Sequence, residues 1–203
     1  MQPLIVNLNG KKVVIVGGGK IAARKARTLD EEGPAITFIA PTFIDEVIEI
    51  SQQKGYTLIQ READASDFSE AILVILATND RNVNQALAKA VPLYQLVCVV
   101  DDQEDGNVQF PATVRRGHLQ LAVSSGGASP KLTRKLKREL EEQFDESWEG
   151  YTAFLSECRT IIKKLPIPSE EKNEKLAKLL DDRFRMDLQA QQEELEQLKS
   201  IKQ

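Results

Sequence analysis

The stretch VVIVGGGKIAARKA, residues 13–26, places three glycines between a short apolar run and a basic, alanine-rich segment. Glycine is costly unless the backbone must turn sharply or another group must come close to it. A buried strand, a glycine turn and a helix in this order are typical of the first βα unit of a dinucleotide-binding fold. This stretch therefore indicates both the fold class and the end of the sheet at which a ligand binds.

The first hundred residues alternate apolar runs with helical patterns. The predicted strands are residues 13–16, 35–40, 57–60, 71–77 and 96–100. The predicted helices are residues 21–32, 43–54 and 82–91. Residues 71–77, AILVILA, are continuously apolar, as expected for a strand in the middle of a parallel sheet. This rhythm predicts an α/β fold with a doubly wound, Rossmann-like parallel sheet.

The pattern changes after Asp101. DDQEDGN, residues 101–107, is an acidic loop, and residues 119–124 form a predicted strand. In SSGGASP, residues 124–130, Ser129 and Pro130 predict the cap and first position of a helix that runs to Phe144. Further helices are predicted at residues 148–165 and 169–201. We expect three domains: a nucleotide-binding domain (1–114), a central region (115–145) and a helical C-terminal domain (146–203).

Composition narrows the classes of protein. The chain has 203 residues and a net charge of −4, so it lacks the basic field expected of a nucleic-acid-binding protein. Its two cysteines lie far apart and indicate free thiols in a reducing compartment. No apolar run approaches the length of a membrane span, and the N-terminus lacks a signal-peptide pattern. We expect a cytoplasmic protein without membrane or nucleic-acid partners.

The glycine turn fits the pattern G-x-G-x-x-A. The first glycine permits the tight turn, the third lets backbone amides approach a pyrophosphate, and the alanine keeps the helix close to the sheet. The free amides at the helix N-terminus then favour phosphate. The predicted contacts are Gly17, Gly18, Gly19, Lys20 and Ile21, with Ala22 as the packing residue. The alternative is a tight βα turn that binds no ligand.

The second predicted strand lacks a feature common in this fold. An Asp or Glu about 20 residues beyond the glycines often binds the ribose hydroxyls. Here the strand ends with Ala40-Pro41-Thr42, no acid occurs before Asp45, and no arginine is present to receive a 2′-phosphate. We expect ribose contacts from the backbone near Pro41 and from the Thr42 hydroxyl. These residues favour NAD over NADP only weakly.

ATND, residues 77–80, follows the most apolar strand. The carboxyl ends of such strands face the ligand crevice, so Thr78 and Asn79 are predicted to bind the cofactor. The alternative is that Asn79 or Asp80 caps the following helix. The two interpretations are compatible.

Five motifs can now be taken together: VVIVGGGKIAARKA, ILATND, VCVVDD, FPATVRRG and LAVSSGGASPKLTRKLKREL. They resemble the siroheme-synthase dehydrogenase family, which comprises stand-alone precorrin-2 dehydrogenases and bifunctional dehydrogenase/ferrochelatases. The resemblance covers about residues 4–145, and SSGGASP after a strand is its most specific part. The segment FDESWEGYTAFLSECR is more similar to the stand-alone, bacillus-type enzymes.

The resemblance implies NAD-dependent oxidation of precorrin-2, a tetrapyrrole, to sirohydrochlorin in siroheme biosynthesis. It also implies a homodimer formed through the central region, and transfer of the product to a separate ferrochelatase. The implied cofactor contacts are Gly18, Gly19, Lys20, Ile21, Pro41, Thr42 and the Thr78–Asn79 turn.

The family's key acid is an aspartate in the loop after VCVV. Asp101 matches the position of the fused enzymes and Asp105 that of the stand-alone type. Loss of a hydride leaves a macrocyclic cation that must also release a proton, and a carboxylate can stabilise the charge and accept that proton. The alternative is that residues 101–107 are only a solvated turn.

The family also implies substrate binding in the serine loop. Ser124 and Ser125 are the candidates, and Arg116 and Lys131 are basic residues suited to the carboxylates of a tetrapyrrole. The alternatives are loop and cap chemistry for the serines and a solvated, ion-paired helix face for the basic residues. His118 is the single histidine, so we expect no permanent metal site.

Two other functions remain open at this point. One adds ferrochelatase activity to the dehydrogenase. The other is a non-catalytic module in which the Rossmann domain senses a nucleotide and the helical segment binds a partner. Because the leucines after residue 169 do not keep strict heptads, we expect that segment to pack back onto its own protein rather than form a coiled coil.

Overall fold

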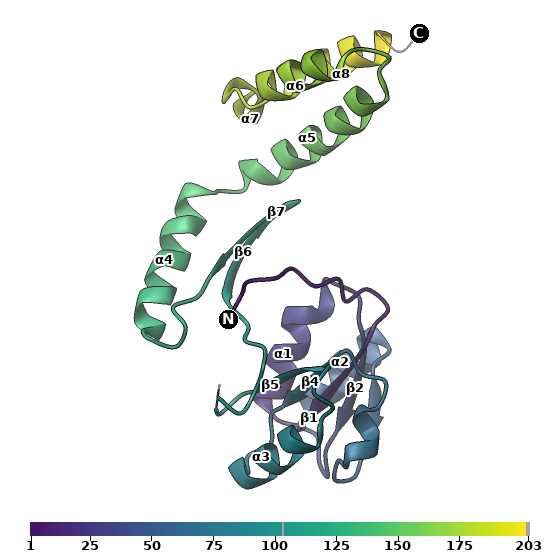
Figure 1. Ribbon diagram of the computed structural model, residues 1–203, viewed down its shortest axis with the longest axis vertical. Coiled ribbons are helices and arrows are strands. Elements are labelled where there is room, and N and C mark those ends of the chain that lie inside the picture. The colour runs from purple at the N-terminus through teal and green to yellow at the C-terminus, as the bar shows by residue number, and fades with distance from the viewer. Residues whose placement is uncertain (103, 202–203) are drawn as a thin grey trace. The chain divides into compact units, whose positions relative to one another are not determined.

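The computed structural model describes residues 1–102 and 104–201. The chain divides into two compact units, an N-terminal unit (Met1–Phe110) and a C-terminal unit (Pro111–Gln203). Figure 1 shows the strands and helices of each unit.

The N-terminal unit contains a five-stranded parallel sheet in the order β3-β2-β1-β4-β5. Its strands are β1 (Lys12–Val16), β2 (Ala35–Ile39), β3 (Thr57–Ile59), β4 (Leu73–Leu76) and β5 (Leu96–Val99). The predicted doubly wound sheet is confirmed. Strand order reverses between β1 and β4, and in such sheets ligands bind at this switch point, outside the carboxyl ends of the strands.

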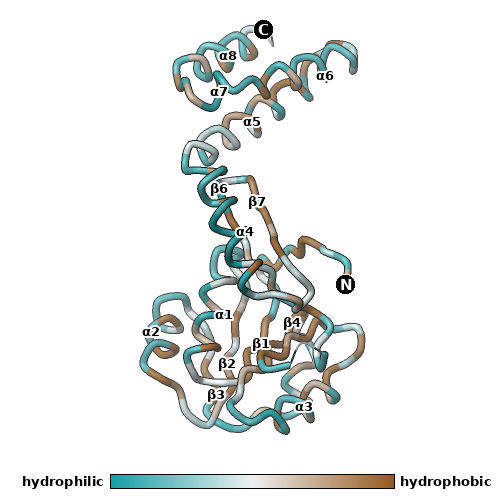
Figure 2. The backbone as a smooth tube through the Cα atoms, turned by 90° about the vertical axis from the view of Figure 1, so that its left-hand side faces the viewer, coloured by the Kyte–Doolittle hydropathy of each residue, from teal (hydrophilic) through white to brown (hydrophobic). Residues whose placement is uncertain are grey.

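Helices cover both faces of the sheet. They are α1 (Lys20–Asp30), α2 (Asp45–Lys54), the 3₁₀ helix η1 (Ala65–Phe68) and α3 (Arg81–Ala90). The alanines of α1 and the apolar residues of α2 pack on one face, and Phe68 and α3 pack on the other. Strand β4 and residues 13–16 of β1 are apolar, as Figure 2 shows, because both faces of these central strands are buried.

The chain after β5 returns to cover the free edge of this strand. The Asn107 amide donates to the Val97 carbonyl at 2.9 Å. Its side chain accepts from the Val97 amide and donates to the Gln95 carbonyl, both at 2.7 Å. A Cβ on Gly106 would lie 2.7 Å from the Val97 carbonyl oxygen, so only glycine fits there. The acidic loop is thereby fastened to the sheet at its far end.

The C-terminal unit begins with an antiparallel hairpin, β6 (Ala112–Arg116) and β7 (Leu119–Val123), followed by α4 (Pro130–Gln143). Ser129 caps α4 by accepting from the Leu132 amide at 3.2 Å, with Pro130 in the first turn, as predicted. Strand β6 was not predicted because ATVRR has two charges and little apolar alternation. It spans the expected boundary at 114/115, and the three-domain division stays a prediction.

The remaining helices are α5 (Ser147–Lys164), α6 (Ser169–Lys178), α7 (Arg183–Met186) and α8 (Leu188–Ser200). The prediction of one helix over residues 169–201 was wrong. The chain breaks after α6 and again at Asp187, which caps α8. These breaks let Leu179, Phe184 and Leu198 pack against α5 in one apolar cluster. A single straight helix of this length could not bring all three onto α5.

Among the residues that the structure describes, no helix has the length and apolar character needed to cross a membrane.

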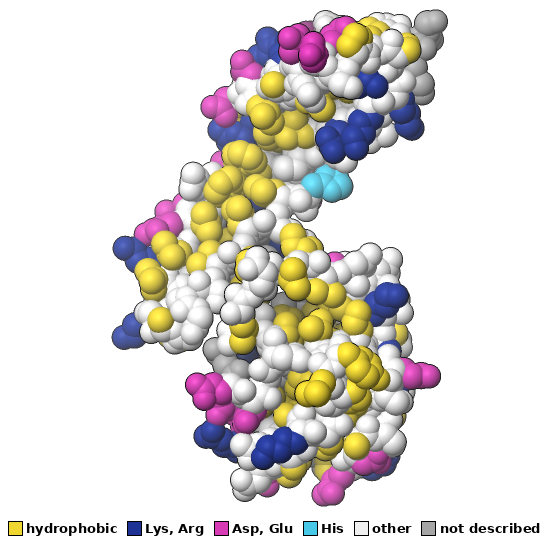
Figure 3. Space-filling model, viewed as in Figure 1, with side chains coloured by type: hydrophobic (Ala, Val, Ile, Leu, Met, Phe, Trp, Pro, Cys, Tyr) yellow, Lys and Arg dark blue, Asp and Glu magenta, His cyan; other side chains and the backbone are white. Residues whose placement is uncertain are grey.

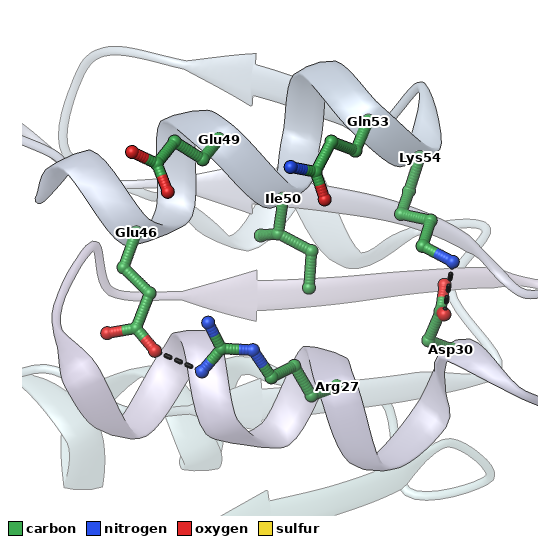
Figure 4. A pocket seen from close by; sticks show the side chains of 7 residues that line it. All are labelled: Arg27, Asp30, Glu46, Glu49, Ile50, Gln53 and Lys54. Carbon is green, nitrogen blue, oxygen red and sulfur yellow. Dashed lines mark hydrogen bonds and ion pairs between the residues drawn. The ribbon is translucent and has the colours of Figure 1, made fainter.

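A charged pocket lies between α1 and α2 (Figure 4). Lys54 Nζ lies 2.6 Å from an Asp30 carboxylate oxygen, and the Tyr56 hydroxyl donates to the other at 2.7 Å. Arg27 pairs with Glu46 across the same pocket. The bond from Lys54, followed by that from Tyr56, lowers the pKa of Asp30. Because these charges are paired within the chain, they tie the two helices together.

This clamp predicts a dependence of stability on pH. A carboxylate whose pKa is lowered by folding stabilises the folded state above its unfolded pKa of about 3.9, and this contribution disappears as the pH falls through the folded value. We expect Asp30→Asn to lower the melting temperature at pH 7, and the difference from wild type to shrink towards pH 2. Thermal unfolding followed by circular dichroism measures this. Glu62→Gln, at an exposed carboxylate, is the control that should melt like wild type. A difference for Asp30→Asn that stays constant with pH would contradict the prediction.

Candidate functional site

Gly17 and Gly18 form the turn between β1 and α1, where the backbone is in close contact with two neighbouring segments. Gly17 has φ of 132°, and a Cβ there would clash with the carbonyl oxygen of Ala77. A Cβ on Gly18 would clash with the carbonyl oxygen of Thr42. These two glycines are therefore required by the fold, since they let the turn pack between the ends of β4 and β2.

Gly19 differs from both. Nothing lies within 4 Å of the position that its Cβ would occupy. It is the N-cap of α1, no side chain caps this helix, and its first turn contains no acid. The positive end of the helix dipole therefore has no side-chain cap or nearby acid in its first turn, which suits a phosphate group. Ala22 is fully buried and brings α1 onto the sheet, while Lys20 and Ile21 are exposed. The residues present fit the pyrophosphate of a dinucleotide.

The segment after β2 is open to solvent at Pro41 and Thr42. The Pro41 carbonyl accepts from the Gln60 side chain at 3.2 Å, which ties this segment to the end of β3. The next residue, Arg61, donates to both carboxylate oxygens of Asp67 at 2.9 and 2.6 Å. Its guanidinium is therefore already committed to a carboxylate.

The turn after β4 is held mainly by internal bonds. Asp80 caps α3 by accepting from the Asn82 amide at 2.8 Å, so the capping interpretation is confirmed for Asp80. The Thr78 hydroxyl lies 2.7 Å from the Asn84 side-chain oxygen. Asn79 is exposed at the carboxyl end of β4, where a ligand could reach it. Contacts of Thr78 and Asn79 with a cofactor stay a prediction.

Asn84 connects two segments at the carboxyl edge of the sheet. It is fully buried, its oxygen accepts from the Thr78 amide at 3.2 Å, and its nitrogen donates to Asp101 Oδ1 at 3.1 Å. It thus links the turn after β4 to the loop after β5. Sequence reasoning missed this residue. The available signal was an asparagine inside a helix, where its intrinsic propensity is poor.

The acidic loop lies against α3 through three aspartates. Asp101 accepts from Asn84, Asp102 pairs with Arg81, and Asp105 Oδ1 accepts from the Gln85 side chain at 3.3 Å. The other oxygen of Asp105, Oδ2, is buried and has no hydrogen-bond partner among the described residues. A buried polar atom without a partner is costly and often marks a functional group.

The predicted substrate residues lie in the C-terminal unit. Ser124 Oγ accepts from the Gly126 amide at 3.2 Å, and Ser125 Oγ accepts from the Ser129 amide at 3.1 Å. The Arg116 guanidinium donates to the carbonyls of Arg115 and Glu141 at 2.8 and 3.5 Å. Lys131 is exposed in the first turn of α4. The serines thus stabilise their loop, and Arg116 joins β6 to the last turn of α4.

No group of three or more histidine, cysteine or acidic side chains within residues 1–102 and 104–201 could hold a metal ion. His118 is exposed (Figure 3), and its backbone amide donates to the Thr152 hydroxyl at 3.2 Å. Both cysteines are buried free thiols. Burial raises the pKa of Cys98 and, with nearby Glu194 and Glu157, raises that of Cys158 to about 12, so neither is a reactive thiolate.

A parallel sheet with a glycine turn at its switch point and an uncapped helix beyond it defines a dinucleotide-binding protein. Comparison with known families agrees part by part. Residues 4–112 match the family described as "Putative NAD(P)-binding". Residues 116–143 match the central region of sirohaem biosynthesis proteins, and residues 148–194 match the SirC C-terminal domain.

The chain belongs to the precorrin-2 dehydrogenase family. It is 37% identical to the precorrin-2 dehydrogenase of Priestia megaterium over 202 residues, which cover 100% of both chains. It is 38% identical to that of Bacillus subtilis strain 168 over 71% of this chain and 90% of the relative. The solved structure of SirC, a precorrin-2 dehydrogenase, superposes with a TM-score of 0.86 at 37% identity, covering 98% of this chain and 100% of that one. The resemblance found in the sequence is confirmed.

The different surroundings of the glycines give a matched pair of variants. We expect Gly17→Ala to destabilise the protein by about 1–3 kcal/mol, because φ is positive and the Cβ meets the Ala77 carbonyl. Gly19→Ala should keep the wild-type melting temperature and weaken NAD⁺ binding roughly tenfold, about 1.4 kcal/mol, because its Cβ enters the open space beside the α1 amides. Calorimetry measures both quantities.

Gly150→Ala, on α5 with nothing within 4 Å of its Cβ position, is the control that should bind NAD⁺ like wild type. Wild-type affinity in Gly19→Ala would exclude this part of the turn from the binding site.

Proposed function

We propose that this protein is an NAD-dependent precorrin-2 dehydrogenase that oxidises precorrin-2 to sirohydrochlorin in siroheme biosynthesis. The observation that carries the proposal is the end-to-end similarity to a stand-alone enzyme of that name. The site gives independent support. A glycine turn suited to pyrophosphate follows β1, and the aspartates of the loop after β5 are bound by side chains of α3.

The cofactor contacts proposed here are of three kinds. The turn and the first residues of α1 hold the pyrophosphate, the segment after β2 contacts the ribose, and the turn after β4 contacts the remaining part of the dinucleotide. Bound NAD⁺ supplies the hydride acceptor. The residues are Gly17, Gly18, Gly19, Lys20 and Ile21, then Pro41 and Thr42, then Thr78 and Asn79.

Asp105 is proposed as the catalytic base. Dehydrogenation removes two hydrogens from the macrocycle, one with its electron pair as hydride and the other as a proton. The second needs an acceptor, and Asp105 has a carboxylate oxygen that no described residue binds. Asp101 is the second candidate. Its carboxylate is exposed and takes part in the Asn84 link, which suits stabilisation of the cation formed by hydride loss.

The substrate contacts proposed are Ser124, Ser125, Arg116 and Lys131. The tetrapyrrole carries carboxylates, for which exposed basic side chains are suitable partners. Lys131 is better supported than Arg116, because the Arg116 guanidinium already binds two backbone carbonyls. The Ser124 hydroxyl belongs to an exposed residue and accepts one bond from Gly126, which leaves its proton free to donate.

We also propose a homodimer formed through residues 115–145. Helix α4 contains no buried residue, and its Leu132 and Leu136 are 48% and 37% exposed. An amphipathic helix with its apolar side uncovered is expected to pack against a second copy.

The buried free thiols support a cytoplasmic location. We also propose that the product, sirohydrochlorin, is transferred to a separate ferrochelatase.

Turnover is tested by incubating the purified protein with precorrin-2 and NAD⁺ without oxygen and following the absorbance of sirohydrochlorin. Asp105→Ala should lower the rate by about 10²–10⁴-fold, the contribution of an acid–base group. The neighbouring exposed acid, changed in Glu104→Ala, should leave the rate unchanged. A protein that binds NAD⁺ and converts no precorrin-2 above the no-enzyme rate would instead be a nucleotide sensor.

The choice of dinucleotide is tested separately. Asp67 holds Arg61, just beyond β3, in two hydrogen bonds, so the Arg61 guanidinium is not free to bind a 2′-phosphate. We expect kcat/KM for NAD⁺ to exceed that for NADP⁺ by at least roughly tenfold, 1.4 kcal/mol. Asp67→Asn should narrow this ratio by releasing Arg61, whereas Asp64→Asn, at an exposed carboxylate 3.7 Å from Arg61, should keep it. Equal use of both dinucleotides by wild type would refute the assignment.

A further inference from the structure

Helix α3 presents two adjacent amide side chains to the acidic loop, and they serve different purposes. Asn84 is fully buried and makes four hydrogen bonds, three with Thr78 and one with Asp101. Its removal would disturb the turn after β4 as well as the loop. Gln85 is half-buried, and the one hydrogen bond recorded for its side chain goes to Asp105. Gln85 is therefore the residue whose effect is confined to a single carboxylate.

The backbone beside Asp105 is fixed. Gly106 lies so close to β5 that a Cβ would be 2.7 Å from the Val97 carbonyl oxygen and 3.2 Å from the Val99 nitrogen. The next residue, Asn107, is bound through its side chain to the backbone of Val97 in β5 and of Gln95 just before it. What remains adjustable is the orientation of the carboxylate. Gln85 Nε2, 3.3 Å from Oδ1, is its hydrogen-bond donor among the described residues, and Oδ2 is left buried without a partner.

The charges near Asp105 show why a neutral donor matters. On α3, Arg81 is paired with Asp102, so its charge is largely offset. The loop itself adds Asp101 and Glu104, both exposed acids. An arginine or lysine at position 85 would hold the carboxylate strongly and lower its basicity, whereas an acid would raise its proton affinity by repulsion. A neutral amide orients the carboxylate without placing a charge beside it.

We propose that Gln85 is the positioning residue of the reaction: it binds Oδ1 of Asp105 and so fixes the orientation of the carboxylate that accepts the substrate proton. This inference rests on the proposed function, because it names the residue that orients the base of that same site. Gln85 lies outside every motif that carried the family resemblance. It acts through Asp105 and does not itself touch the reacting atoms.

The test uses a pair of variants with opposite charges. Gln85→Glu places a second carboxylate beside Oδ1, and Gln85→Lys places an ammonium there. We expect the carboxyl titration of Asp105 to move up by about one pH unit in the first and down by about one in the second. Carbon-13 NMR of the full chain without ligands measures this, and Asp105→Asn identifies the signal. The controls are Ala86→Glu and Ala86→Lys, the same charges on an exposed position of the same helix, which should leave the signal in place.

The pH profile of kcat/KM provides the second measurement. If Asp105 is the base, the acidic limb of the profile should move in the same directions as the NMR titration. The NMR experiment does not need turnover, so it tests the contact between Gln85 and Asp105 by itself, whereas a protein that fails to oxidise precorrin-2 refutes the proposed function. The inference is overturned if the NMR titration midpoint of Asp105 is the same in both Gln85 variants as in wild type. It is also overturned if the Ala86 variants shift this midpoint as much as the Gln85 variants do. An acidic limb that stays fixed while the NMR titration moves also overturns it, because Asp105 is then not the base.

Discussion

The structure depends on the close approach of the β1–α1 turn to the ends of two other strands. Gly17 lies against the Ala77 carbonyl beyond β4, and Gly18 against the Thr42 carbonyl beyond β2. No side chain fits in either place, so the backbone itself fills the switch point of the sheet. This packing brings the segments after β1, β2 and β4 together and leaves the N-terminus of α1 without a side-chain cap. The proposed binding site is thus a consequence of how tightly the first turn is packed.

Helix α3 organises the other half of the site. Asp80 fixes its start, and Arg81, Asn84 and Gln85 each hold one aspartate of the loop after β5. The far end of the loop is fastened to the edge of β5 by Asn107. A segment whose composition is that of a solvated turn is therefore ordered at both ends. This order at both ends supports the proposal of Asp105 as the catalytic base, since a base must be held in position to be effective.

The C-terminal unit is built on different principles. Its hairpin and α4 contain few buried residues, and Val114 alone is buried in β6. The helical part beyond has its own apolar cluster, in which Phe154 stacks on Phe184 with ring centroids 5.4 Å apart and the Tyr151 hydroxyl donates to the Leu179 carbonyl at 2.8 Å. The helical part is stabilised by its own core, whereas the hairpin and α4 have apolar surface available for a partner.

The sequence by itself determined the parallel sheet, the glycine turn, the cap at Ser129 and the family, and it narrowed the cap of α3 to Asn79 or Asp80. These features follow from local rules: continuous apolar runs, glycine where a Cβ cannot fit, and short polar residues at helix starts. Only the tertiary structure decided the rest. It showed that Gly19 differs from Gly17 and Gly18, that Asn84 and Gln85 hold the acids, and that residues 169–201 fold as three helices. Each of these depends on which distant backbone or side chain lies opposite, and the spacing of residues along the chain does not contain that information.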